Sequence, residues 1–83
     1  MSAIVPLWTE EFEAGVLAAQ PKLHAYAMSL CRDLHRAQDL TQDTMLRAFL
    51  KFEQYEPGTN LIGWLFTILR NDWYSQCRKK GRE

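Results

Sequence analysis

The chain has 83 residues, enough for one small domain with a modest core. Its hydrophobic content of 47% is ordinary for a globular protein, so the composition excludes a disordered chain. The apolar runs are too short to cross a bilayer, and the N-terminus carries no secretion signal. We therefore expect a cytoplasmic protein with no membrane partner.

The formal net charge is zero, but the charge is unevenly distributed along the chain. Residues 1–69 hold five Lys/Arg and eight Asp/Glu, a balance of −3, whereas residues 70–83 hold five and two, a balance of +3. An acidic body with a basic end indicates two different partners. Cys31 and Cys77 are isolated, with no metal-binding or disulfide spacing, so we predict no metal site, no cofactor and a reducing compartment.

Helical periodicity predicts three main helices and no strand. Thr9 is placed to cap the first helix, which is either broken or kinked at Pro21 because proline lacks the backbone N–H. Asp33 is placed to cap the second helix, which runs to about Gln54. The predicted fold class is therefore all-α, a compact helical bundle.

One face of the second main helix is unusual for a solvated surface. It carries carboxylates, an amide and two leucines: Asp39, Gln42, Asp43, Leu46, Leu50 and Glu53. An acidic rim around exposed apolar residues is typical of a docking surface for a basic amphipathic partner. The alternative is that Leu46 and Leu50 pack on the N-terminal helices.

The last helix, predicted from Asn60 to Arg82, has a core side that includes Trp64 and Asp72. The opposite side carries cations, an amide and an aromatic ring: Arg70, Asn71, Tyr74 and Arg78, continuing into Lys79 and Lys80. Such a strip suits a phosphate backbone with exposed bases, and the alternative is a solvated face with a basic end. Trp73, at the margin, is either a core residue or a stacking residue.

The segment before this helix is the clearest loop. Pro57 followed by Gly58 favours a tight turn with a positive φ at the glycine. Thr59 or Asn60 then caps the final helix. A turn in which backbone N–H groups and an Asn amide converge can read the edge of an extruded base.

The string Asp39-Leu40-Thr41-Gln42-Asp43-Thr44-Met45-Leu46-Arg47-Ala48 closely resembles the signature of region 2 of bacterial sigma factors of the extracytoplasmic-function group (group IV). Residues 52–60 and 64–71 continue in the family's order and spacing, and the similarity is greatest to the general-stress type of alphaproteobacteria. The resemblance covers roughly residues 23–82. It implies a sigma region 2 domain that docks on the β′ clamp helices of RNA polymerase core. It further implies recognition and melting of the promoter −10 element on the non-template strand, and control by an anti-sigma factor.

The family's pattern assigns two sets of residues. The polymerase-binding positions correspond to Asp39, Gln42, Asp43, Leu46 and Leu50. The DNA-binding positions correspond to Glu56, Gly58, Thr59, Asn60, Arg70, Asn71, Tyr74, Arg78, Lys79 and Lys80, and we add Trp73 to this set because its ring can stack on an unpaired base. Asp43 stands where the family more often has Glu, which keeps the charge but shortens its reach.

The resemblance also marks a departure. The family carries a second helical domain that reads the promoter −35 element, and no segment of this chain corresponds to it. The chain is therefore either an excised domain, which we favour, or a protein without −35 recognition. We expect a flexible tail over residues 1–8 and the region 2 domain over residues 9–83.

Three other functions compete with a sigma region 2 domain. The main alternative is a sigma-like decoy that binds an anti-sigma factor without binding DNA. An enzyme is not predicted, because His24 and His35 are expected at the surface outside any catalytic spacing, and Asp39 and Asp43 lie on a convex helix face. A helix-turn-helix reader would need a short turn between two short helices, whereas the turn here precedes a long helix.

Overall fold

A computed structural model describes the backbone of residues 8–82 and the side chains of residues 8–79. The described chain contains four α-helices and one 3-10 turn, and no strand lies within residues 8–82. In order these are α1 (Glu10–Ala18), α2 (Gln20–Cys31), α3 (Leu34–Leu50), η1 (Phe52–Gln54) and α4 (Leu61–Arg82). The expected all-α class is confirmed. Of the expected tail over residues 1–8, residues 1–7 lie outside the described part of the chain.

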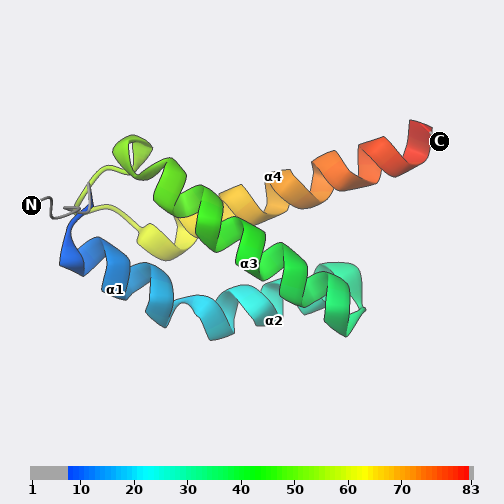
Figure 1. Ribbon diagram of the computed structural model, residues 1–83, viewed down its shortest axis with the longest axis horizontal. Coiled ribbons are helices and arrows are strands. Elements are labelled where there is room, and N and C mark those ends of the chain that lie inside the picture. The colour runs from blue at the N-terminus through cyan, green and yellow to red at the C-terminus, as the bar shows by residue number, and fades with distance from the viewer. Residues whose placement is uncertain (1–7, 83) are drawn as a thin grey trace, which may run out of the picture.

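The first predicted helix is broken into two. Thr9 caps α1, where its Oγ1 accepts a hydrogen bond from the N–H of Phe12 at 3.0 Å. The break falls at Ala19, and Pro21 lies in the first turn of α2, where its missing N–H costs nothing. In Figure 1, α1 and α2 follow one another along the same side of the bundle.

A sharp reversal connects α2 to α3. Arg32 adopts the left-handed conformation with φ 56°, and its N–H bonds to the carbonyl of Met28 at 2.9 Å. Asp33 then caps α3 through a 3.2 Å hydrogen bond from the N–H of Arg36, as predicted. These two residues turn the chain so that α3 runs back beside α2 (Figure 1).

The buried face of α3 consists largely of small residues, including Ala37 and Ala48, which let the neighbouring helices approach closely. Its two buried hydroxyls are satisfied within the helix, because Thr41 and Thr44 donate to the carbonyls of Ala37 and Leu40 at 2.7 and 2.8 Å. The prediction that this helix runs to about Gln54 was wrong: α3 ends at Leu50 and a 3-10 turn follows. The turn carries Phe52 into an aromatic cluster instead of continuing the helix.

That aromatic cluster joins the start of α1, the end of α3 and the loop before α4. Trp8, which the sequence pattern assigned to the tail, lies 4.6 Å from the ring of Phe49. Phe12 contacts Phe49, Tyr55 and Trp64 with centroid distances of 5.9, 5.7 and 6.0 Å. The cluster therefore fixes the position of the loop on which site residues are predicted.

Helix α4 lies across α3 and projects beyond the other helices at its C-terminal end (Figure 1). Its buried side includes Leu65, Ile68, Leu69 and Asp72. Trp64, placed with the core by the sequence pattern, is half-buried and packs against the core cluster. None of the helices in the described part of the chain has both the length and the apolar character needed to cross a membrane.

Candidate functional site

A stripe of acidic and apolar side chains runs along the solvent side of α3. We call it the acidic–apolar stripe, and it consists of Asp39, Gln42, Asp43, Leu46 and Leu50. Leu46 and Leu50 are 57% and 74% exposed, so the alternative that they pack on the N-terminal helices is wrong. Two leucines held in water beside carboxylates gain nothing from the fold itself, which is typical of a surface that is covered by a partner.

At its centre the stripe is tied to α4 by an ionic network. The Nε of Arg47 lies 2.8 Å from Oδ2 of Asp43, one helical turn away, and its Nη2 lies 3.5 Å from Oδ1 of Asp72 on α4. Asp72 is only 7% exposed, and its Oδ2 is buried without a hydrogen-bond donor among the described residues. Arg47 is thus shared between an exposed and a buried carboxylate.

Burial, and after it the hydrogen-bonded and negatively charged Asp43, raise the pKa of Asp72 from 3.8 to about 6, while Arg47 and Gln76 oppose the shift. The pKa of Asp43 moves down, because Asp72 and then Arg47 hydrogen-bond to its charged form. The two carboxyls therefore ionise at well-separated pH values, and Asp43 is the first to lose its proton as the pH rises.

A second surface lies beside this network. A hollow of about 400 Å³, the α3–α4 groove, is formed where the end of α3 crosses α4. Its lining is largely cationic and polar: Arg47, Lys51, Ile68, Asn71, Asp72, Ser75, Gln76 and Lys79. Three cations and an exposed amide within one groove suit a phosphate backbone with an adjacent base.

The loop before α4 is internally hydrogen-bonded. Gly58 has φ 89°, so the predicted positive φ is confirmed. Thr59 donates through Oγ1 to the carbonyl of Glu56 at 2.6 Å, and the hydroxyl of Tyr55 donates to the carbonyl of Thr59 at 2.8 Å. Asn60 caps α4, because its Oδ1 accepts from the N–H of Gly63 at 3.1 Å. The capping oxygen is thus engaged, while the amide nitrogen of Asn60 is the atom that remains for another partner.

The predicted DNA-binding residues fall into separate groups. Glu56, Gly58, Thr59 and Asn60 are exposed on the loop, and Arg70, Asn71, Tyr74, Arg78 and Lys79 are exposed on α4. Of these, Asn71 and Lys79 line the α3–α4 groove. Trp73 is not grouped with them: it is half-buried, packs on the core and lies under the guanidinium of Arg36, 5.0 Å from its ring centroid. The side chain of Lys80 lies outside the described residues.

Sequence reasoning missed Arg47 and Lys51 as candidates for the groove. The two cations are four residues apart at the end of α3 and face the same side, a signal that the helical period does contain. It did not identify a site because the groove exists only where α3 and α4 cross.

The remaining polar candidates do not form a reactive centre in the described chain. His35 is exposed as expected, whereas His24 is partly buried and its Nε2 is secluded from water. Cys31 and Cys77 are free, and burial raises the pKa of the Cys31 thiol. No cluster of three His, Cys, Asp or Glu residues that could hold a metal ion occurs in the described part.

The sequence of this helical bundle matches one family of transcription initiation factors. The chain belongs to the Sigma-70 region 2 family, whose pattern matches residues 16–83. It is 48% identical over 75 residues to the ECF RNA polymerase sigma factor EcfG of Rhodopseudomonas palustris (strain TIE-1), a match that covers 90% of this chain and 41% of that protein. It is 35% identical over 80 residues to the ECF RNA polymerase sigma factor SigE of Mycolicibacterium smegmatis, covering 96% of this chain and 29% of that protein.

A solved structure of a sigma factor is also similar to this chain. The sigma factor RpoE of Bartonella quintana, in complex with the anti-sigma factor NepR, is similar with a TM-score of 0.82 and 47% identity over 89% of this chain and 46% of that one. The chain thus spans less than half the length of these relatives. The resemblance to extracytoplasmic-function sigma factors is confirmed.

Proposed function

We propose that this chain docks on the β′ clamp helices of RNA polymerase core and recognises and melts the promoter −10 element. The observation that carries the proposal is the exposure of Leu46 and Leu50 in line with the carboxylates of α3. A basic amphipathic helix of the polymerase would bury both leucines and pair with Asp39 and Asp43.

The α3–α4 groove supports the second half of this proposal. Arg47, Lys51 and Lys79 supply attraction to phosphate that is independent of sequence. Asn71 presents an amide, which is the group that can discriminate between base edges. The exposed ring of Tyr74 can stack on an unpaired base, which repays part of the cost of unstacking the duplex. The interface consists of binding groups alone, with no covalent step.

The docking half is tested by measuring the affinity of the chain for bacterial RNA polymerase core. The double variant Asp39→Ala with Leu50→Ala removes one carboxylate and one leucine of the stripe that lie outside the Arg47 network. We expect at least a tenfold loss of affinity, roughly 1.4 kcal/mol or more. Leu34→Ala is the matched control, because Leu34 is on the same helix and 53% exposed but lies outside the stripe. Unchanged affinity of the double variant would refute the docking assignment.

The DNA half is tested with a random-sequence library of single-stranded DNA. Selection on the immobilised chain is expected to enrich a short base preference, and the affinity of the enriched strand is expected to fall steeply with salt. The variant Asn71→Ala should lose the base preference while keeping the salt dependence, because the cations remain.

An anti-sigma factor is a second proposed partner, because the similar RpoE is held in a complex with NepR. Competition between such an inhibitor and the polymerase core for this chain is the expected result if both cover the acidic–apolar stripe. A sigma-like decoy, which would bind the inhibitor alone, gives no account of the three cations in the α3–α4 groove. A chain that binds the inhibitor but shows neither base preference nor salt-dependent affinity would favour the decoy.

A further inference from the structure

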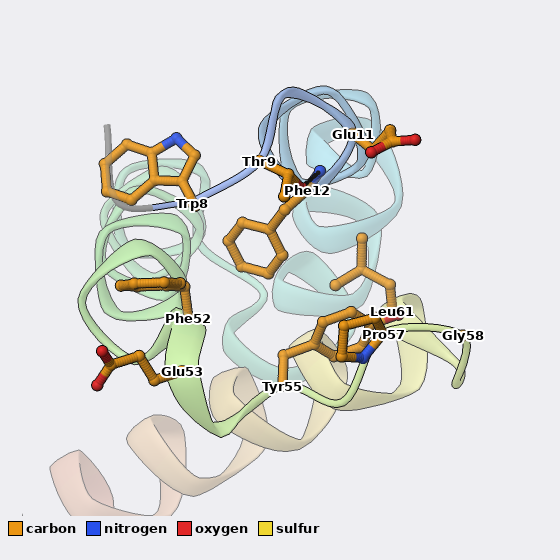
Figure 2. Close-up of a pocket in the computed structure, with 10 residues that line it drawn as sticks. All are labelled: Trp8, Thr9, Glu11, Phe12, Phe52, Glu53, Tyr55, Pro57, Gly58 and Leu61. Carbon is orange, nitrogen blue, oxygen red and sulfur yellow. Dashed lines mark hydrogen bonds between the residues drawn. The ribbon is translucent and has the colours of Figure 1, made fainter. Parts of the chain in front are cut away.

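A buried carboxyl group connects the acidic–apolar stripe to the core of the bundle. One oxygen of Asp72 lies 3.5 Å from Nη2 of Arg47, and the other has no hydrogen-bond donor among the described residues. Glu11 and Glu53, by contrast, are exposed and direct their carboxylates away from the aromatic cluster into solvent (Figure 2). Water solvates those two charges, whereas a charge on Asp72 is opposed by one long ion pair. Burial therefore favours the neutral form of Asp72.

The neutral form of Asp72 also has a specific partner. A protonated carboxyl can donate one hydrogen bond, and the acceptor here is Asp43 on α3. Burial first, and then this hydrogen bond, raise the pKa of Asp72 to about 6. Asp43 also accepts from Nε of Arg47 at 2.8 Å. With Asp72 neutral, two donors therefore hold the carboxylate of Asp43, and its charge is balanced by that of the guanidinium.

Loss of the Asp72 proton to solvent changes this arrangement. The hydrogen bond from Asp72 to Asp43 disappears, and two negative charges now face each other across the junction of α3 and α4. Arg47 is then attracted by both carboxylates at once, so its hold on Asp43 weakens. One cation and two carboxylates leave a net negative charge where the neutral form of Asp72 leaves none.

The other groups that face Asp72 lie on the same two helices. Gln76 on α4 hydrogen-bonds to its charged form, and Lys51 of α3 and Lys79 of α4 line the groove beside it. Helices α1 and α2, which also pack against α4 and are fully described, contribute no residue to that lining. Both lysines are cationic in either state of Asp72, so the change of charge in this region belongs to one carboxyl.

We propose that Asp43, Arg47 and Asp72 form a proton-sensitive switch, which weakens the docking of a basic partner on the acidic–apolar stripe when Asp72 is protonated. Loss of the proton adds a negative charge behind Asp43 and removes a donor that competes for its oxygens. A cationic group of the partner then pairs more strongly with Asp43. The inference rests on the proposed docking of RNA polymerase core and adds a regulation that docking alone does not require.

The direction of the effect follows from linkage between protons and the partner. A cationic partner stabilises the charged form of Asp72, so binding lowers the pKa of this carboxyl and releases a proton. Affinity should therefore be lowest where Asp72 is protonated in the free chain, and should rise as the pH increases through about 6.

The test measures the affinity of the chain for RNA polymerase core at about pH 5 and pH 7.5 and at one ionic strength. The variant Asp72→Asn keeps the shape, remains neutral at both pH values, and has an amide that can donate to Asp43. Parent and variant should bind equally at about pH 5, and the variant should bind about threefold to tenfold more weakly at pH 7.5. Histidines of either protein affect parent and variant alike and cancel in the ratio of the two affinities. A ratio that is the same at both pH values would overturn the proposal.

Asp33→Asn is the matched control, because it removes an exposed carboxylate at the start of α3 that lies outside the stripe. Its affinity relative to the parent should be the same at both pH values. If Asp33→Asn instead shows the same pH-dependent loss as Asp72→Asn, the effect comes from the overall charge of the chain and the switch is refuted.

A second readout does not involve the polymerase. In the ¹⁵N-labelled chain, the Nε–H signal of Arg47 should move with a midpoint near pH 6 and should stay in place in Asp72→Asn. An Arg47 signal that ignores Asp72 would overturn the switch while leaving the docking assignment intact. Unchanged affinity of the Asp39→Ala, Leu50→Ala double variant would instead refute docking itself, and the proposed regulation with it. The two failures are therefore distinguishable.

Discussion

Arg47 and Asp72 face each other across the junction of α3 and α4, with Nη2 of the arginine 3.5 Å from Oδ1 of the buried carboxyl. The same guanidinium lies 2.8 Å from Asp43 in the acidic–apolar stripe and also lines the α3–α4 groove. One side chain therefore belongs to both proposed surfaces. The state of Asp72 decides how strongly Arg47 is drawn toward α4.

The buried carboxyl predicts an unusual dependence of stability on pH. The folded pKa of Asp72 is raised from 3.8 to about 6, so the folded state binds more protons than the unfolded state between these values. The contribution of Asp72 to the free energy of unfolding should therefore be full below pH 3.8, fall as the pH rises from there and be lost above about 6, a change of up to about 3 kcal/mol for a shift of this size. Asp43 acts in the opposite sense, but only below its ordinary pKa of 3.8, because its folded pKa is lowered.

Thermal unfolding between pH 4.5 and 8 checks this prediction. The variant Asp72→Asn keeps the shape without the charge, so it should be more stable than the parent at pH 7.5 by about 1 kcal/mol or more, and its midpoint should be nearly flat above pH 5. Asp33→Asn is the matched control, because this residue is exposed and an asparagine retains the cap. If the unfolding midpoints of the parent and of Asp72→Asn change with pH in the same way, the pKa of Asp72 is not raised by folding.

The cations of the α3–α4 groove lead to a second prediction. Lys51→Ala removes a cation that lines the groove but lies outside the Arg47 network, so the fold should be unaffected. Affinity for single-stranded DNA should fall about threefold to tenfold, and the slope of log affinity against log salt should become smaller by about 0.7. Fluorescence anisotropy at several salt concentrations measures both. Lys22→Ala, an exposed cation on α2, should change neither.

The exposed leucines lead to a third prediction, on stability and not on binding. Leu46→Gln and Leu50→Gln should change the free energy of unfolding by less than about 0.5 kcal/mol each, because both side chains are more than half exposed. Leu69→Ala, at a fully buried position, should cost about 2–5 kcal/mol. Urea unfolding curves measure all three variants. A large loss in Leu50→Gln would mean that this leucine is covered in solution.

How far the sequence predicts this molecule depends on the distance over which the determining contacts act. The exposed stripe on α3, the caps at Thr9 and Asp33 and the turn at Gly58 were predicted correctly, because each rests on residues within about three helical turns of one another. The end of α3 was predicted incorrectly, because Phe52 leaves the helical path to join an aromatic cluster. Another member of this cluster, Trp8, lies far from Phe52 in the sequence.

The residues of the candidate site were likewise predicted only in part. Asn71 and Lys79 were predicted from the polar side of α4, but Arg47 and Lys51 were not, because their relation to α4 depends on where two helices cross. Trp73 could be either core or stacking residue from the period alone. The guanidinium of Arg36, which lies over its ring, comes from a different helix and resolves the choice toward packing.

The cap of α4 yields the last prediction, in which two roles of one side chain are separated. Asn60 uses Oδ1 to accept from the N–H of Gly63 at 3.1 Å, and we propose that its amide nitrogen donates to DNA. Asn60→Ala loses both functions and should cost about 1 kcal/mol of stability. Asn60→Asp keeps the capping oxygen and adds a charge that the helix N-terminus favours, so its stability should equal or exceed that of the parent.

Affinity for single-stranded DNA should nevertheless fall in Asn60→Asp, since a carboxylate replaces the donor and repels phosphate. Thermal unfolding and DNA titration of the same three proteins decide the matter: an Asn60→Asp chain that binds DNA as well as the parent would limit Asn60 to capping.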